Sequence, residues 1–122
     1  MIIVPLDKAL PENEIKSLVE RSGAEAIVCE GKYLEAVEKM KGNLLKYIIS
    51  MDETENKEVM LYENLRLQGK KLREQGNDEY EKIEINPEEM SILLFTSGTT
   101  NVSKGVMISQ HNICSNIQAI AS

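Results

Sequence analysis

The sequence alternates short aliphatic runs, rich in β-branched residues, with longer stretches whose apolar residues recur at helical spacing. A short continuous apolar run is typical of a strand covered on both faces, and spacing of three and four is typical of an amphipathic helix. Strands separated by single helices favour a parallel sheet with helices packed on it. We therefore predict an α/β fold with a mostly parallel sheet flanked by helices. The predicted strands are Ile2–Val4, Glu25–Glu30, Leu44–Met51, Met90–Phe95 and a further short one at Gly105–Ser109.

Helix-terminating and helix-capping residues divide the remaining stretches. Gly23 and Gly76 are placed to end helices in the left-handed conformation that glycine tolerates, and Ser109 is placed to cap the last helix. That last helix carries Ile113, Ile117 and Ile120 on one face. The predicted helices run from Pro11 to Gly23, from about Lys32 to Lys41, from Leu61 to Gly76, and onward from Ser109.

Length and charge limit the classes of protein to consider. With 122 residues the chain is one domain or part of one. Its net charge of −6 argues against a nucleic-acid binder, which needs a clustered basic face. No stretch is long and apolar enough for a transmembrane helix, and the N-terminus does not resemble a signal peptide. We expect a cytoplasmic protein.

The cysteines and the histidine do not form a recognisable catalytic or metal-binding pattern. Cys29 and Cys114 are far apart, and we expect both to be reduced and partly buried. His111 is the only histidine, so no metal site is expected. It also has no acidic partner nearby in the sequence, and we expect it to pack or cap near the start of the last helix. Cys114 is expected in the core rather than as a nucleophile.

One segment, TSGTTNVSKG (residues 96–105), carries most of the chemical information. Gly98 can adopt positive φ and lets ligand atoms approach the backbone, whose successive N–H groups can then converge on an anion. Lys104 adds a mobile positive charge. A phosphate chain is the ligand that uses all of these groups at once. The hydroxyl donors are Thr96, Ser97, Thr99 and Thr100.

The ordinary nucleotide P-loop does not account for this segment. That motif needs glycine immediately before its lysine and Ser or Thr immediately after it. Lys104 instead lies between Ser103 and Gly105. A GTPase or a Walker-type ATPase is therefore disfavoured.

The segment FTSGTTNVSKGV (residues 95–106) closely resembles the phosphate-binding signature of the AMP-forming adenylating enzymes, [YF]TSGTTGxPKGV. This superfamily includes acyl-CoA synthetases, luciferases and the adenylation domains of peptide synthetases. The resemblance continues through MISQHNICSNI and includes VPLDKALPENEI near the start, so it spans essentially the whole chain. The chain is most similar to bacterial long-chain fatty-acid CoA ligases. Two departures, Asn101 for glycine and Ser103 for proline, are changes that can weaken nucleotide binding.

The resemblance implies a two-step ligation. A carboxylate attacks the α-phosphate of Mg·ATP to give an acyl-adenylate and pyrophosphate, and the thiol of CoA then displaces AMP. Carried over by the motif match, six residues would bind the β- and γ-phosphates of ATP: Thr96, Ser97, Gly98, Thr99, Thr100 and Lys104. The reaction would require ATP, Mg²⁺ and CoA. The carboxylic acid is expected to be a long-chain fatty acid.

The resemblance also implies that residues 1–122 are a fragment of the AMP-binding N-terminal domain, with the phosphate-binding loop at residues 96–105. The family's adenine-binding segment, magnesium-binding glutamate and C-terminal catalytic lysine are expected further along than Ser122. No catalytic residue is therefore assigned within residues 1–122, and the isolated fragment is expected to be inactive. The alternative is a degenerate or truncated homologue that serves as a non-catalytic binding module. Self-association through uncovered sheet edges and helix faces is a further candidate interaction.

Overall fold

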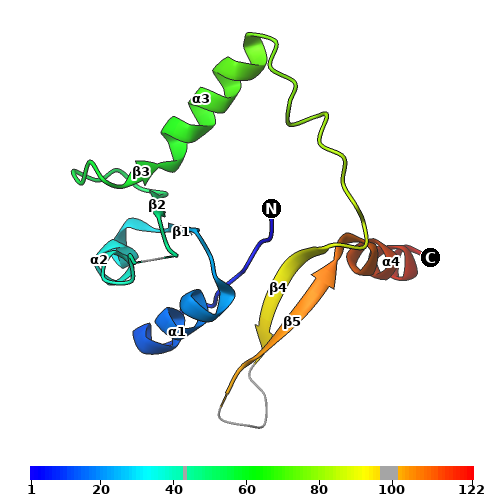
Figure 1. The fold of residues 1–122 in the computed structure, drawn as a ribbon, viewed down its shortest axis with the longest axis horizontal. Coiled ribbons are helices and arrows are strands. Elements are labelled where there is room, and N and C mark those ends of the chain that lie inside the picture. The colour runs from blue at the N-terminus through cyan, green and yellow to red at the C-terminus, as the bar shows by residue number, and fades with distance from the viewer. Residues whose placement is uncertain (43, 97–101) are drawn as a thin grey trace. The chain divides into compact units, whose positions relative to one another are not determined.

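The computed structural model describes residues 1–42, 44–96 and 102–122. These residues divide into two compact units, which we describe separately (Figure 1). Residues 19–83 form the sheet unit. Residues 1–18 and 84–122 form the hairpin unit, and helix α1 (Glu12–Ser22) runs across the division.

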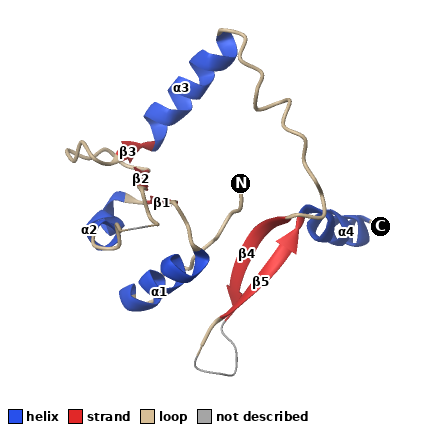
Figure 2. Cartoon of the chain, viewed as in Figure 1, coloured by secondary structure: helices blue, strands red, loops and turns tan. Residues whose placement is uncertain are grey.

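The sheet unit contains a three-stranded parallel sheet in the order β1–β2–β3 (Figure 2). Burial of apolar side chains between this sheet and its crossover helix supplies the core, in which Val37, Ile48 and Val59 are buried. Four partly buried residues pack against them: Ile27, Cys29, Tyr33 and Leu34. The elements are β1 (Ala26–Cys29), the 3₁₀ helix η1 (Gly31–Tyr33), α2 (Leu34–Glu38), β2 (Tyr47–Ser50) and β3 (Met60–Leu61).

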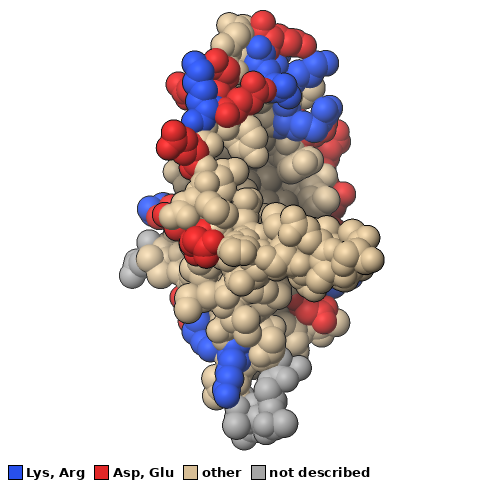
Figure 3. Space-filling view, turned by 90° about the vertical axis from the view of Figure 1, so that its right-hand side faces the viewer, with Lys and Arg blue, Asp and Glu red and all other residues tan. Residues whose placement is uncertain are grey.

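Helix α3 (Tyr62–Glu74) follows β3 and ends in a glycine cap. Gly76 has φ of 88°, its N–H donates to the Arg73 carbonyl, and the Asn77 N–H donates to the Leu72 carbonyl, both at 2.9 Å. This pair of bonds satisfies carbonyls that the helix end leaves open. At the top of Figure 3, the level at which α3 is drawn in Figure 1, basic and acidic side chains are interleaved rather than separated by sign. The ion pairs there are Glu63–Arg66, Lys70–Glu74, Arg73–Glu81 and Asp78–Lys82.

The hairpin unit is built on an antiparallel pair, β4 (Met90–Thr96) and β5 (Lys104–Ser109), followed by α4 (Gln110–Ala121). A parallel bridge joins Ile3 to Ile92 on the other side of β4. Ser109 caps α4: its hydroxyl accepts from the Asn112 N–H, while the Asn112 side chain accepts from the Ser109 N–H. This reciprocal capping box satisfies two donors at the start of the helix.

The predicted α/β class with a parallel sheet is confirmed, and the errors lie at element boundaries. Of the strand predicted at Ile2–Val4, only Ile3 pairs, through a single bridge. The helix predicted over 32–41 is instead η1 followed by the short α2. The sequence indicated a strand at 105–109 but not its direction, which is antiparallel to β4. Among the described residues, no helix is long and apolar enough to cross a membrane.

Candidate phosphate-binding site

Two of the predicted phosphate-binding residues face each other across the β4–β5 pair. Thr96 ends β4, Lys104 begins β5, and the two are direct partners in the register. Directly opposed residues in an antiparallel pair project from the same face, so the hydroxyl and the ammonium share one side of the hairpin. The Thr96 hydroxyl donates to the Lys104 carbonyl at 3.4 Å, and both residues are exposed. An anion at this end of the hairpin can therefore meet both groups.

The other four predicted phosphate-binding residues lie outside the described residues. They are Ser97, Gly98, Thr99 and Thr100; Asn101, one of the two departures from the family pattern, lies outside as well. The structure thus fixes the two ends of the predicted loop, Thr96 and Lys104, and the prediction for its centre stays a prediction. Ser103, the other departure, is half-buried beside Lys104.

Gly105 has a packing role that the motif alone does not explain. It is the register partner of Phe95, on the opposite face from Thr96 and Lys104. A Cβ at Gly105 would lie 3.2 Å from Leu93 Cδ1 and 3.5 Å from Phe95 Cε1. The missing side chain therefore leaves room for Leu93 and Phe95 directly behind the lysine. Sequence reasoning placed Gly105 within the motif but assigned it no contact.

The far end of the hairpin from the loop is closed by a contact between Glu88 and His111. His111 Nδ1 lies 2.5 Å from Glu88 Oε1, and the His111 N–H donates to the Pro87 carbonyl at 2.9 Å. Sequence inspection found no acidic partner for His111 because Glu88 lies 23 positions earlier. His111 lies near the start of α4 as expected, although Ser109, rather than His111, supplies the cap.

A turn with several hydrogen bonds follows β2 at the carboxyl end of the parallel sheet. Ser50 is fully buried; its hydroxyl donates to the Asp52 carbonyl at 2.6 Å and accepts from the Asp52 N–H at 3.1 Å. The Asp52 carboxylate accepts from the Gly31 N–H at 2.6 Å. Burial, and secondly the Asp52 charge, raise the pKa of the Cys29 thiol. A raised pKa leaves less thiolate, so this surrounding suits a structural cysteine rather than a nucleophile.

The two cysteines differ in exposure. Cys29 is partly buried, as predicted, whereas Cys114 is exposed, so the expectation that Cys114 lies in the core is wrong. The physical reason is that α4 has no buried residue, and its predicted apolar stripe includes Ile117 and Ile120 at 59% and 79% exposure. Both cysteines are free. No group of three or more potential metal ligands occurs within the described ranges.

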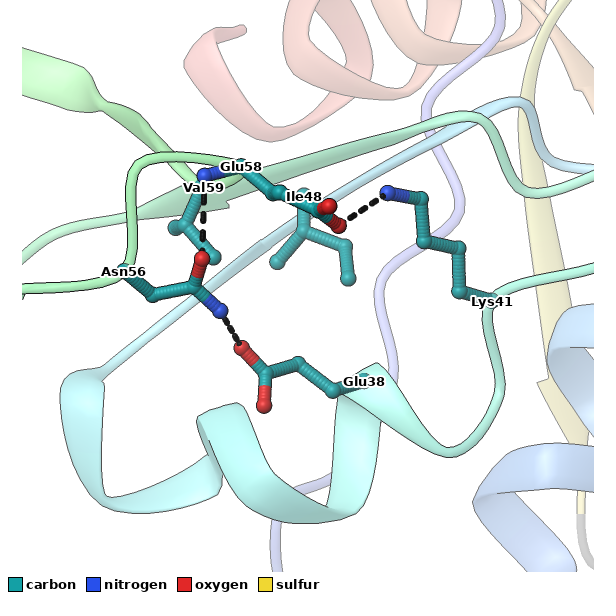
Figure 4. Close-up of a pocket in the computed structure, with 6 residues that line it drawn as sticks. All are labelled: Glu38, Lys41, Ile48, Asn56, Glu58 and Val59. Atoms are coloured by element: carbon teal, nitrogen blue, oxygen red, sulfur yellow. Dashed lines mark hydrogen bonds and ion pairs between the residues drawn. The ribbon is translucent and has the colours of Figure 1, made fainter.

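A cavity of about 210 Å³ in the sheet unit contains none of the predicted site residues (Figure 4). Its polar groups largely satisfy one another. Lys41 Nζ lies 3.1 Å from Glu58 Oε2, the Asn56 amide donates to Glu38 Oε1, and the Glu58 N–H donates to Asn56 Oδ1 at 2.9 Å. Ile48 and Val59 complete the lining. We assign this cavity no ligand, since its polar contacts are those of an ordered loop.

The family model described as "AMP-binding enzyme" matches residues 1–122. The chain is 33% identical to fatty acyl-CoA synthetase A of Dictyostelium discoideum, over 96% of this chain and 18% of the relative. It is 30% identical to long-chain-fatty-acid–CoA ligase 5 of Rattus norvegicus, over 98% of this chain and 19% of the relative. The chain therefore spans about a fifth of the length of these two proteins.

Solved structures have the same fold. The anthranilate CoA ligase AuaEII, in complex with anthranoyl-AMP, superposes with a TM-score of 0.77 at 21% identity, over 96% of this chain and 22% of that protein. A long-chain-fatty-acid CoA ligase structure from Rhodopseudomonas palustris gives 0.74 at 14% identity, over 98% of this chain and 28% of that one. At these identities the likeness concerns the fold alone.

Proposed function

The chain belongs to the AMP-binding enzyme family, and from that premise we propose that it acts in the ATP-dependent activation of a long-chain fatty acid as an acyl-adenylate. Residues 96–105 would hold the β- and γ-phosphates of Mg·ATP. The acyl group would then pass to the thiol of CoA with release of AMP. Two observations support the proposal: the family match along the whole chain and the pairing of Thr96 with Lys104, which joins the two ends of the loop.

The described residues fit the phosphate-binding part of this reaction. Lys104 is exposed and begins β5, so its stem projects from an ordered strand and its ammonium can approach a phosphate oxygen. The Thr96 hydroxyl shares that face, and by rotating away from the Lys104 carbonyl, its acceptor at 3.4 Å, it can donate to the same anion. Charge that develops on the departing pyrophosphate would be stabilised by these two donors, and such electrostatic stabilisation is the main contribution a protein makes to this kind of transfer.

The remaining parts of the proposal follow from family membership. We propose that residues 1–122 belong to the AMP-binding N-terminal domain, that Ser97, Gly98, Thr99 and Thr100 complete the loop, and that Mg²⁺ enters as Mg·ATP. On the same premise, the 122-residue chain by itself is predicted not to form acyl-adenylate. We place the reaction in the cytoplasm, where free cysteines such as Cys29 and Cys114 persist.

Pyrophosphate release tests the proposal. The complete protein, supplied with Mg·ATP and a panel of carboxylic acids, should release pyrophosphate with long-chain fatty acids and much more slowly with short or aromatic acids. Lys104→Ala should reduce this rate mainly through ATP, with the KM for the fatty acid little changed. Lys82→Ala removes a lysine from the sheet unit and serves as the matched control. ATP binding without pyrophosphate release for any acid would instead indicate the non-catalytic binding module.

A further inference from the structure

The base of the β4–β5 hairpin contains an irregularity in its pairing. Met90 pairs with Ser109 and Ile92 pairs with Ile108, so Ser91 is an extra residue on β4 with no partner on β5. Such a bulge interrupts the ladder and bends the strand that contains it. The Ser91 carbonyl instead accepts from the Ile3 N–H at 2.9 Å. Below the bulge only the Met90–Ser109 pair joins β5 to β4, so contacts outside the ladder can add to what holds β5 at this base.

Contacts of this kind join the segment before β4 to the start of α4, through Glu88 and His111. Pro87 and Glu88 precede β4, His111 follows β5, and each of the two contacts between them crosses the open base of the hairpin. Both ends of the link are themselves ordered. Asn86 Oδ1 accepts from the Glu88 N–H at 3.1 Å, and the Ser109–Asn112 capping box fixes the first turn of α4. The Glu88 carboxylate also lies near the positive end of the α4 dipole, which favours its charge there.

Hairpin register determines which side chains stand opposite each other at the loop. A slip of one residue would turn every side chain of one strand to the opposite face, and Lys104 would no longer share a face with Thr96. A two-stranded hairpin is marginally stable by itself, and Ile3 pairs only with the β4 side, so contacts at the ends of the β4–β5 pair add to what holds its register. The loop end carries the proposed ligand-binding groups. A contact at the opposite end, the base, can hold the β4–β5 register without occupying the ligand-binding groups.

We propose that Glu88 and His111 form a clasp that holds the β4–β5 register and thereby positions Lys104 beside Thr96 for phosphate binding. The second half of this inference rests on the proposed function. Both residues are positioning residues, since they act through the ladder and lie at the end of the hairpin away from the loop. The Nδ1 atom carries the proton in this arrangement, because the acceptor is a carboxylate oxygen.

The clasp is tested without ligand by two measurements on the protein. As His111 is the only histidine, a ¹⁵N-resolved imidazole spectrum reports it directly. The spectrum should show the ring proton on Nδ1, and Glu88→Ala should shift the ring toward the tautomer protonated on Nε2. Amide hydrogen exchange along β4 and β5 should accelerate about two- to five-fold in Glu88→Ala and in His111→Ala, the range expected when an exposed side-chain pair is broken. The double variant should exchange no faster than either single one, because the two changes break one interaction. Additive effects, or ladder exchange equal to that of the control Glu84→Ala, would overturn the clasp.

Positioning is tested with tripolyphosphate as the probe, since its binding requires no catalysis. Glu88→Ala should weaken tripolyphosphate binding about two- to five-fold, following the ladder opening, while Glu84→Ala should leave it unchanged. Equal affinity in both variants overturns the positioning role. Absence of binding by the unmodified protein is a different result: it overturns the proposed function and, with it, the positioning half of this inference. The hydrogen-exchange measurements on the Glu88 and His111 variants would then still test whether the clasp holds the β4–β5 register.

Discussion

Replacing Ser50 by alanine should destabilise the sheet unit through one buried hydroxyl. Ser50 is fully buried, and its oxygen makes two hydrogen bonds to the backbone of Asp52. A hydrogen bond contributes about 0.5–1.5 kcal/mol net, and the exposed position of Asp52 lets water replace part of what is lost. We therefore expect the free energy of unfolding to fall by about 1–2 kcal/mol. With a urea m-value of about 1–2 kcal/mol per molar, the midpoint should fall by roughly 1 M.

The same substitution should have a local effect that identifies its cause. The Asp52 carboxylate accepts a hydrogen bond from the Gly31 N–H. Loosening the turn should therefore accelerate hydrogen exchange at the Gly31 amide more than at the amides of the β1–β2 ladder. Ser91→Ala is the matched control, because the Ser91 hydroxyl makes only a 3.5 Å contact with the Glu89 carbonyl and its loss should cost under about 0.5 kcal/mol. If Ser50→Ala and Ser91→Ala lower the urea midpoint equally, the buried hydroxyl of Ser50 does not stabilise the sheet unit.

Four further predictions concern other sites. Gly105→Val should destabilise the hairpin unit by about 1–3 kcal/mol in urea unfolding, because its side chain enters the space of Leu93 and Phe95. Gly69→Ala in α3 should stabilise the chain by about 0.5–1 kcal/mol, since a Cβ there meets nothing within 4 Å; a loss of similar size in both variants would refute this reading. At pH 8, iodoacetamide should modify Cys29 more slowly than the exposed Cys114, because a raised pKa leaves less thiolate at that pH. Asp52→Asn should lower the Cys29 pKa and accelerate its modification, and an unchanged rate would contradict the contribution of the Asp52 charge.

Local signals predicted the parts of the fold that depend on neighbouring residues. Gly23 and Gly76 do adopt positive φ at helix ends, and Ser109 does cap α4, because the conformational freedom of glycine and the short side chain of serine act within a few residues. The strand β4 was predicted because its run of apolar residues is also a local feature of the sequence. The helix boundaries predicted over 32–41 differ from the structure, in which this stretch forms the 3₁₀ helix η1 followed by the short helix α2.

Long-range pairing was not predictable from the sequence. The antiparallel direction of β5, the bulge at Ser91 and the approach of Glu88 to His111 are set by chain topology, and no local periodicity encodes them. The packing role of Gly105 was missed for the same reason, because the position of Gly105 opposite Phe95 follows only from the hairpin register. Cys114 was misplaced because an apolar helical stripe indicates that a face can be buried, and in α4 that face stays exposed.

The central claim, that residues 96–105 bind the outer phosphates of ATP, is tested most directly by comparing ATP with AMP. Backbone amide shifts of Thr96 and of residues 102–105 should change saturably with Mg·ATP and with tripolyphosphate, and should not respond to AMP, which lacks the β- and γ-phosphates. Lys104→Ala should weaken Mg·ATP binding about ten-fold or more, the value of a charge-assisted hydrogen bond, while Lys82→Ala should not. Equal responses to ATP and AMP, or equal affinities in the two lysine variants, would contradict the account.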